Sequence, residues 1–322
     1  MYTVGIVGCG VIGNRLAETF TDHAETTVHA ACDLDEAKLD AFVTEYDCER
    51  FTDHRSLVGD DSIDIVYVGV PPVHHRDVVL DALDAEKHVI CEKPIAEHAG
   101  AGEEMVEAAR RSDRTTAVNL PFRYTAGFVE MRERIERGAI GDPKRVMLRF
   151  RFPEWPREWQ DVDWLRGREQ GGPLREVGTH FLFGTQELFG PIDEVCADVR
   201  YTAPDRYEES IVGHFTVDGV HGIIDLLCDH DAPEENSITV EGTESSLSLT
   251  EWYKLIERPD TDAASAVVDD RIRTTMRLVD EFVTELDGGD GDLVSFGEAT
   301  SVQRVVDAVF ADVVDGSAER SG

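Results

Sequence analysis

Residues 4–13 read VGIVGCGVIG, an apolar run followed by three glycines in the spacing G-x-G-x-x-G. The run Val4–Val7 predicts a buried strand, and a helical pattern begins at Val11. A lone glycine motif is a weak signal, but a strand before it and a helix after it make it specific. The stretch therefore predicts the first β-α unit of a dinucleotide-binding sheet.

Each glycine of this motif has a separate role. Gly8 permits a tight turn, Gly10 lets a pyrophosphate approach the backbone, and Gly13 lets helix and strand pack closely. The N–H groups and the dipole at the helix start favour phosphate charge. The predicted cofactor contacts in this loop are Gly8, Gly10, Val11, Ile12 and Gly13.

Asp33 ends the second apolar run, 20 residues after Gly13. A carboxylate at this place accepts hydrogen bonds from the ribose hydroxyls of the adenosine and repels a 2′-phosphate. No basic residue occurs among residues 34–36. The sequence therefore predicts NAD rather than NADP, against the alternative that the glycines only turn the chain and Asp33 caps the next helix.

The first 120 residues alternate between apolar runs and helical patterns, which predicts β-α-β units and a parallel sheet. The apolar runs lie at Val4–Val7, Val28–Cys32, Ile63–Val70, His88–Cys91 and Thr115–Val118, and the helical patterns near 12–22, 35–46, 73–85 and 97–112. Beyond them we expect helices near 125–137, 175–189, 269–286 and 297–314, and strands near 144–152, 193–202, 209–217, 220–228, 236–241, 245–249 and 251–257.

These patterns predict an α/β protein of two domains. Residues 1–120 form a doubly wound parallel Rossmann sheet, and residues 121–322 form an α+β domain with a large, mostly antiparallel open sheet. The C-terminal helix is expected to be able to pack back on the Rossmann domain.

The charge balance excludes one class of partner. The 66 acidic residues exceed the 31 basic ones, for a net charge of −35, whereas a nucleic-acid-binding protein needs a basic surface. An acidic, lysine-poor surface resembles those of proteins from salt-loving organisms. No apolar stretch approaches 18 residues, and we expect no membrane span. The N-terminus shows no secretory signal, and the six cysteines form no C-x-x-C pair, so we expect a cytoplasmic protein with free thiols.

Lys93 is the first candidate catalytic residue. The apolar strand His88–Cys91 ends in Glu92-Lys93-Pro94, and ligands bind at the carboxyl ends of strands in a doubly wound sheet. Pro94 restricts Lys93 to an extended conformation and favours a cis bond more than other residues do. A lysine near a nicotinamide can handle protons. The alternative is a surface lysine in a loop.

Glu176 and His180 are the second candidate pair. They are four residues apart, so a helix over 175–189 places both on one face, where the carboxylate can orient the imidazole as a proton shuttle. Zinc is the rival hypothesis, but no third ligand has a suitable spacing, and we predict no metal. A surface Glu–His pair is the remaining alternative.

The loop Val70–His75 follows another strand and is expected to border the cofactor. Pro71 and His75 are its predicted contacts, unless the loop only starts the next helix. Glu92 and Lys93, which follow the next strand, are predicted cofactor contacts as well. The segment that holds Trp155, Trp159, Trp164 and Arg166 could wall a substrate pocket, or belong to the core or an interface.

Several motifs together resemble the Gfo/Idh/MocA oxidoreductases. They are the glycine loop Gly8–Gly13, the loop Val70–His75, the tripeptide Glu92-Lys93-Pro94, the stretches Asn119–Tyr124 and Gly138–Gly141, and Gly171–His180, which is similar to a G-G-x-x-x-D-x-G-x-H segment. Glu176 stands where the family has Asp, and the longer side chain could shift the imidazole or the substrate.

The resemblance implies an NAD-dependent enzyme that exchanges hydride with a carbinol carbon of a sugar, inositol or similar polyol. It implies Lys93 and His180 beside the substrate hydroxyl with Glu176 as acidic partner, and adds Arg123 and Trp164 as substrate contacts. His180 would accept the hydroxyl proton and Lys93 would stabilise the oxygen, or the two would exchange roles. The resemblance also implies dimers or tetramers formed through the open sheet.

Two other functions stay open at this point. Members of the family include enzymes that use NAD transiently as lyases, epimerases or glycosidases. A dinucleotide-sensing regulator is the non-enzymatic alternative, and the pair Lys93 and His180 argues against it.

The acidic surface generates a first prediction. Because salt screens the repulsion between like charges, the melting temperature should rise between low and multi-molar KCl. Thermal denaturation followed by circular dichroism measures it, and an unchanged melting temperature would refute the halophilic assignment.

Overall fold

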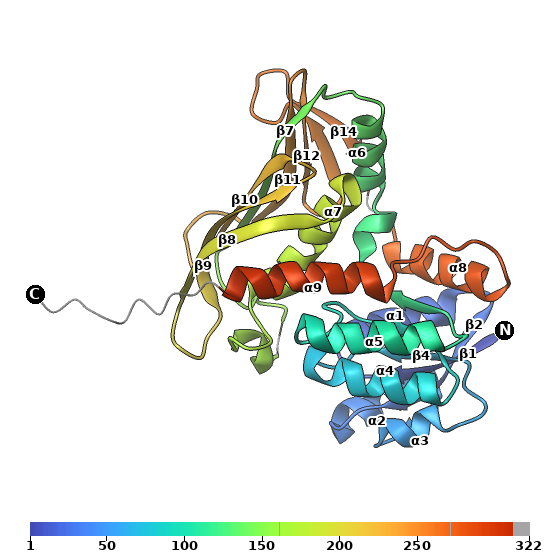
Figure 1. Cartoon of the computed structure of the whole chain (residues 1–322). Coiled ribbons are helices and arrows are strands. Elements are labelled where there is room, and N and C mark those ends of the chain that lie inside the picture. The colour runs from blue at the N-terminus through green and yellow to red at the C-terminus, as the bar shows by residue number, and fades with distance from the viewer. Residues whose placement is uncertain (161, 271, 312–322) are drawn as a thin grey trace, which may run out of the picture. The chain divides into compact units, whose positions relative to one another are not determined.

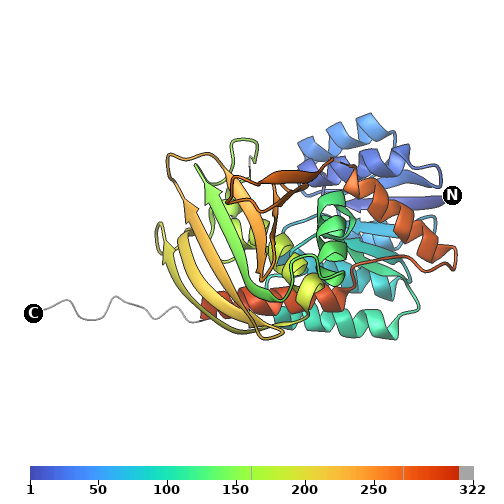
Figure 2. The same cartoon turned by 90° about the horizontal axis from the view of Figure 1, so that it is seen from above.

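Two units make up the structure, and each is built around one sheet (Figures 1 and 2). The computed structural model describes residues 1–160, 162–270 and 272–311. Unit 1 contains residues 1–124 and 272–303, and unit 2 contains residues 125–271 and those from 304 onward. The chain thus returns to unit 1 near its end.

Unit 1 holds a six-stranded sheet in the order β3-β2-β1-β4-β5-β6, in which every strand pair is parallel. The strands are β1 (Tyr2–Val7), β2 (Thr26–Cys32), β3 (Glu49–Phe51), β4 (Ile65–Val68), β5 (His88–Cys91) and β6 (Thr116–Val118). This strand order is that of the doubly wound dinucleotide-binding fold, so the predicted Rossmann domain is confirmed.

Helices cover this sheet, because its central strands are apolar along their whole length. All four residues of β4 are buried, as expected for a parallel strand covered on both faces. The helices of unit 1 are α1 (Val11–Asp22), α2 (Glu36–Tyr46), α3 (His54–Val58), α4 (His75–Asp84), α5 (Ala99–Arg111) and α8 (Thr274–Leu286), with η1 (Pro72–His74), η2 (Pro121–Tyr124) and the first part of α9 (Phe296–Ala311). Leu278 and Phe282 of α8 join the same core as Phe20 of α1.

Local sequence explains where several helices begin. Asp35 accepts hydrogen bonds from the N–H groups of Ala37 and Lys38 and so caps α2. Asp53 caps the short helix α3 through the N–H of Arg55. We did not predict α3 or β3, since five and three residues carry too little periodicity to be recognised.

Unit 2 holds an eight-stranded sheet in the order β14-β13-β12-β11-β7-β10-β9-β8. Only β7 and β10 pair in parallel, so the predicted large, mostly antiparallel sheet is confirmed. The strands are β7 (Pro143–Phe152), β8 (Ile192–Tyr201), β9 (Glu208–Val217), β10 (Val220–Cys228), β11 (Glu235–Gly242), β12 (Ser246–Thr250), β13 (Lys254–Glu257) and β14 (Ser265–Asp269).

One face of this sheet packs against helices, as Figure 2 shows. Buried residues alternate along β7, where Val146, Leu148 and Phe150 are fully buried, and Phe150 contacts Phe181 of α7 edge to face at 5.1 Å. The helical elements of unit 2 are α6 (Ala126–Glu136), η3 (Asp163–Arg166), η4 (Leu174–Gly178), α7 (Thr179–Phe189) and the later part of α9. Among the described residues, no helix combines the length and apolarity that crossing a membrane requires.

Two predicted elements begin later in the structure than the sequence suggests. The strand expected near 251–257 begins only at Lys254, because Glu251 and Trp252 have positive φ angles of 52° and 72° and form a turn. The helix expected from 269 begins at Thr274, after β14, which we had not predicted. The expected end of the last helix at 314 lies outside the described residues.

Candidate active site

Three turns of unit 1 lie at the carboxyl edge of its sheet. They follow β1, β4 and β5, which are neighbours in that order. Backbone hydrogen bonds continue past the strand ends, from the Gly69 N–H to the Val7 oxygen at 2.8 Å and from the Glu92 N–H to the Val68 oxygen at 2.9 Å. The glycine loop, the loop after β4 and the Glu92-Lys93-Pro94 turn therefore share one edge, where ligands of doubly wound sheets bind.

Close backbone contacts explain two of the glycines. Gly8 has φ of +105°, and a Cβ there would lie 2.5 Å from the Gly69 oxygen. A Cβ on Gly13 would lie 1.9 Å from the Gly8 oxygen. Both positions therefore exclude any side chain, because backbone atoms fill the space that it would need.

Gly10 is different, since a Cβ there would meet no atom within 4 Å. The space over Gly10 is open, and Val11 beside it is 57% exposed at the start of α1. Open space above the first N–H groups of a helix is the cradle that a pyrophosphate needs. The loop therefore fits a dinucleotide, because no protein atom packs over Gly10.

Asp33 is held in place at the end of β2. Its Oδ2 accepts a hydrogen bond from the Cys9 N–H at 2.7 Å, and its Oδ1 accepts one from the Asp35 N–H at 2.8 Å. These bonds tie the carboxylate to the glycine loop, where a ribose would reach it. The next residue, Leu34, is 86% exposed and offers an apolar surface that we had not singled out.

Glu92 is the centre of a buried network. Its Oε1 accepts hydrogen bonds from the Tyr67 hydroxyl and the Asn119 amide, both at 2.6 Å, and its Oε2 accepts one from the Lys93 N–H at 3.2 Å. Burial raises the pKa of Glu92, and these bonds oppose that rise because they favour the ionised form. The network fixes the backbone from which the half-buried Lys93 extends. The Lys93–Pro94 peptide bond is cis, as the sequence had suggested.

His75 lies completely buried under the loop after β4. The ring has no exposed surface, and its Nε2 lies 2.7 Å from the Val70 oxygen while its Nδ1 lies 3.1 Å from the Pro94 oxygen. Burial lowers the pKa of His75 to about 4. The ring thus has a structural role, in which it ties the loop after β4 to the turn after β5, and its contact with the cofactor stays a prediction. Pro71 lies half-buried in that loop.

In unit 2, Glu176 and His180 lie on consecutive helical elements. Leu174–Gly178 forms one turn of π-helix, and α7 follows from Thr179. The expected helix near 175–189 thus exists, but the spacing of Glu176 and His180 crosses a π-helical turn, a feature found frequently at functional sites. Glu176 Oε1 accepts a hydrogen bond from Gln160 Nε2 at 3.2 Å, a partner that the sequence did not reveal.

His180 is 94% buried, and its ring meets Trp252 edge to face at 5.3 Å. Trp252 lies in the turn between β12 and β13 with φ of +72°, an unusual conformation for a bulky residue. It also contacts Phe181 at 5.5 Å. We did not single out Trp252, because residues 251–257 resemble one continuous strand in the sequence. The mixed polarity of these seven residues was the only sign of a turn within them.

The tryptophan-rich segment divides into core and surface. Trp155 is 2% exposed and donates to the Leu165 oxygen at 3.0 Å, whereas Trp159 is 54% exposed. The Arg157 guanidinium lies within 6.0 Å of both rings and of Trp252. Trp164 is half-buried on η3. Trp155 is therefore core, and Trp159 and Trp252 carry the accessible aromatic surface near Arg157.

Arg123 is 9% exposed and bonds within unit 1. Its Nη1 donates to Asp292 at 3.2 Å and to the Leu293 oxygen at 2.9 Å, and its Nη2 pairs with Glu298. These partners link η2 to the start of α9. The predicted substrate contact stays a prediction beside this structural role.

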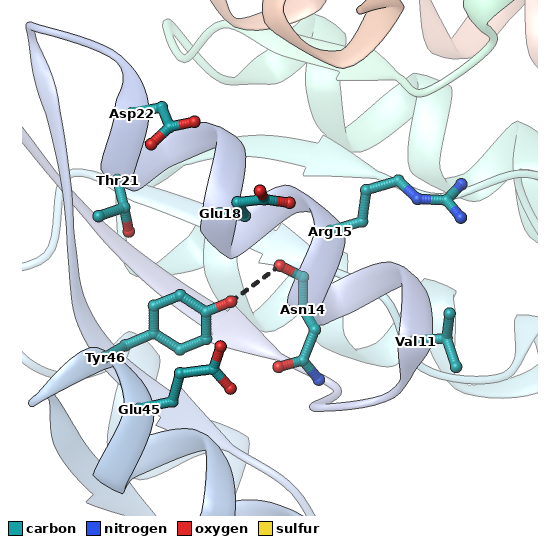
Figure 3. A pocket seen from close by; sticks show the side chains of 8 residues that line it. All are labelled: Val11, Asn14, Arg15, Glu18, Thr21, Asp22, Glu45 and Tyr46. Carbon is teal, nitrogen blue, oxygen red and sulfur yellow. Dashed lines mark hydrogen bonds between the residues drawn. The ribbon is translucent and has the colours of Figure 1, made fainter.

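A hollow lies beside α1 in unit 1. Its lining residues are Val11, Asn14, Arg15, Glu18, Thr21, Asp22, Glu45 and Tyr46 (Figure 3). The Tyr46 hydroxyl donates to the Asn14 oxygen at 3.1 Å across it. Three carboxylates and the Arg15 guanidinium line this hollow, so its charge is mainly negative.

Comparison with known proteins agrees with this geometry. Residues 2–120 match the GFO/IDH/MocA oxidoreductase family, NAD-binding Rossmann fold, and residues 128–248 match the GFO/IDH/MocA C-terminal domain. The chain belongs to the Gfo/Idh/MocA family of oxidoreductases. The resemblance predicted from the motifs is thereby confirmed.

Two curated relatives and one solved structure show the range of similarity. A dTDP-3,4-didehydro-2,6-dideoxy-alpha-D-glucose 3-reductase of Saccharopolyspora spinosa is 31% identical over 58% of this chain and 58% of its own length. Inositol 2-dehydrogenase of Salmonella typhimurium is 33% identical over 44% of each. Levoglucosan dehydrogenase in complex with NADH and levoglucosan has a TM-score of 0.84 at 18% identity, covering 96% of both chains. The alignments to the two curated relatives thus span about half of their lengths, while the fold matches nearly throughout.

The glycine contacts generate a second prediction. In Gly10→Ala the new methyl group meets no protein atom, so the melting temperature should stay unchanged while the affinity for NAD falls at least about tenfold. In Gly13→Ala the methyl group collides with the Gly8 carbonyl, so the free energy of unfolding should fall by about 1–3 kcal/mol. Thermal denaturation and NADH fluorescence titration measure the two effects. Unchanged NAD affinity in Gly10→Ala would remove the loop from cofactor binding.

Proposed function

We propose that the protein is an NAD-dependent dehydrogenase or reductase that acts on a carbinol or carbonyl carbon of a sugar, inositol or similar polyol. The observation that carries the proposal is the shared edge of unit 1. Strands lie about 4.8 Å apart, so β1 and β5, which flank β4, set the glycine loop and the Lys93 turn about 10 Å apart. The reactive ring of a dinucleotide held by that loop can extend toward the lysine over such a distance.

The chemistry assigned to Lys93 follows from its positive charge and from the hydrogen bonds of Glu92 that hold its backbone. Bound NAD would supply the hydride acceptor or donor. The Lys93 ammonium would donate a hydrogen bond to the substrate oxygen and stabilise negative charge there during oxidation. The Glu92 network supports this role, because it fixes the backbone of Lys93 at the end of β5.

His180 would accept the proton of the same hydroxyl, with Glu176 as its acidic partner. Support comes from the burial of His180 and from its packing on Trp252. Trp252 and Trp159, beside Arg157, would offer apolar ring faces to the C–H side of a sugar. Arg123 and Trp164 are retained as proposed substrate contacts.

A third prediction tests Lys93. Lys93→Met removes the charge and keeps the length, so turnover should fall about 10²- to 10⁴-fold while the affinity for NAD stays within about twofold. NADH formation at 340 nm with a panel of sugars and inositols, at high KCl, measures turnover, and fluorescence titration measures affinity. Near-normal turnover would remove Lys93 from the mechanism.

Lys144→Met is the matched control, since Lys144 is an exposed lysine of β7. It should retain full turnover. The same assay separates net oxidation from a non-redox reaction, because a lyase, epimerase or glycosidase would consume substrate without accumulating NADH.

We further propose a homodimer or homotetramer formed through the sheet of unit 2, in the cytoplasm of a salt-loving organism. The sheet face opposite α6 and α7 supports this, because Val212 is 64% exposed and Leu227 is 37% exposed on it. All six cysteines are free thiols, which supports a reducing compartment.

A fourth prediction tests this interface. Val212 lies between Asp198 and Asp225 on the neighbouring strands. Val212→Lys should therefore leave the protomer folded, because two carboxylates flank the new ammonium, and should dissociate the oligomer, because burying that charge is costly. Size-exclusion chromatography with light scattering measures the mass. Val212→Thr, which keeps the shape, should retain the oligomer; a monomeric wild-type protein would refute the proposal.

A further inference from the structure

A buried carboxylate lies under the start of the segment that carries Glu176 and His180. Glu208, the first residue of β9, is 0% exposed, and its Oε1 accepts a hydrogen bond from the Leu174 N–H at 2.7 Å. Leu174 begins η4, and the first N–H groups of a helical segment have no partner within the helix. Glu208 therefore caps the helical segment from a distant strand.

The turn before η4 is shaped around this carboxylate. Gly172 has φ of +96°, and a Cβ there would lie 2.2 Å from Glu208 Oε2. Any side chain at position 172 would therefore displace Glu208 as well as strain the backbone. The conformation of the Gly171–Leu174 turn and the place of the carboxylate depend on each other.

The carboxylate is incompletely satisfied. Across the described part of the chain, no group donates a hydrogen bond to Glu208 Oε2. Arg175 supplies the nearby positive charge, but its guanidinium stacks on Phe310 at 4.2 Å and donates to the Arg168 oxygen at 3.0 Å. The titratable and charged groups that face Glu208 or Arg175 are Arg168 of the preceding loop, Tyr201 of β8, Cys228 of β10 and Asp307 of α9.

Burial consequently raises the pKa of Glu208 to about 7, against the opposing effects of the Leu174 N–H and Arg175. The sign of the coupling follows. A raised pKa in the closed state means that the closed state binds the proton more tightly than any state in which Glu208 meets water. The closed segment is thus favoured while Glu208 is protonated, and that advantage is lost as pH rises through about 7.

We propose that Glu208 is a positioning residue for His180. It holds the Gly171–Leu174 turn, and through η4 it sets the first turn of α7, from which His180 extends. The expected effect of Glu208 on turnover rests on the proposed role of His180 at the substrate hydroxyl. The expected effect of Glu208 on the conformation of the segment does not. Deprotonation of Glu208 loosens this segment, and protonation closes it.

Hydrogen exchange measures how firmly the segment is held, and it needs no substrate. In the wild-type protein, the protection of residues 171–182, corrected for intrinsic exchange, should fall between about pH 5 and about pH 8, with most of the fall below the raised pKa of about 7. Residues of α6 in the same unit should show no such change. Pulsed exchange with mass spectrometry reports both in one experiment, and pH-independent protection of residues 171–182 would overturn the proposal.

Variants measure the functional part. Glu208→Gln keeps the shape and is neutral at every pH, so the protection of residues 171–182 from hydrogen exchange should lose its pH dependence. The ratio of the kcat of this variant to that of the wild type should rise about tenfold as the pH rises over the same range. Glu208→Ala leaves the Leu174 N–H uncapped, so kcat should fall at every pH while NAD affinity is unchanged. Glu209→Gln, an exposed neighbour on β9, is the matched control and should keep the wild-type pH profile.

The outcomes separate this inference from the proposed function. If Lys93→Met retains turnover but protection of residues 171–182 still follows Glu208, the enzymatic mechanism is wrong and the positioning role stands. If Lys93 proves catalytic and Glu208→Gln keeps the wild-type pH dependence of both protection and kcat, the positioning role is wrong.

Discussion

The close approach of the turns after β1 and β4 is the constraint on which unit 1 depends. Gly8 lies so close to the Gly69 carbonyl that no Cβ would fit between the two turns, and Gly13 brings α1 equally close to the Gly8 carbonyl. Gly10 is the one glycine of the motif whose Cβ would meet no atom within 4 Å. The proposed cofactor cradle is thus the space that remains beside the backbone contacts of the other two glycines.

Glu92 extends the same constraint to Lys93. An isolated carboxylate at this depth would be costly, and the structure offsets the cost with hydrogen bonds from Tyr67, Asn119 and the Lys93 backbone. Tyr67 and Asn119 come from the neighbouring strands β4 and the end of β6, so the network bridges three strand ends. The backbone of Lys93 is therefore held by the sheet itself, and rigid support of this kind suits the role proposed for its side chain at a substrate oxygen.

Local pattern made most of unit 1 predictable. The Rossmann sheet, the turn at Gly8, the close packing at Gly13 and the place of Asp33 at the end of β2 follow from the spacing of the sequence, because strand, glycine turn and helix succeed one another in a fixed order. The sequence placed His75 beside the cofactor loop but did not show that carbonyl groups face both ring nitrogens. Glu208 and Trp252 could not be found at all, since their partners, Leu174 and His180, lie far away in sequence.

Several unusual backbone conformations of unit 2 lie in the segments that hold or contact His180. The preceding turn is π-helical, Gly172 has a positive φ, and so does Trp252, a bulky residue for which that conformation costs of order 1–3 kcal/mol. Such conformations persist only where surrounding contacts determine them more strongly than local preference does. Here those contacts are the Glu208 cap at the start of η4 and the packing of Trp252 on Phe181 of α7. An imidazole positioned by these contacts is sensitive to the loss of either one, so its position can be tuned by a single proton on a residue that never touches it.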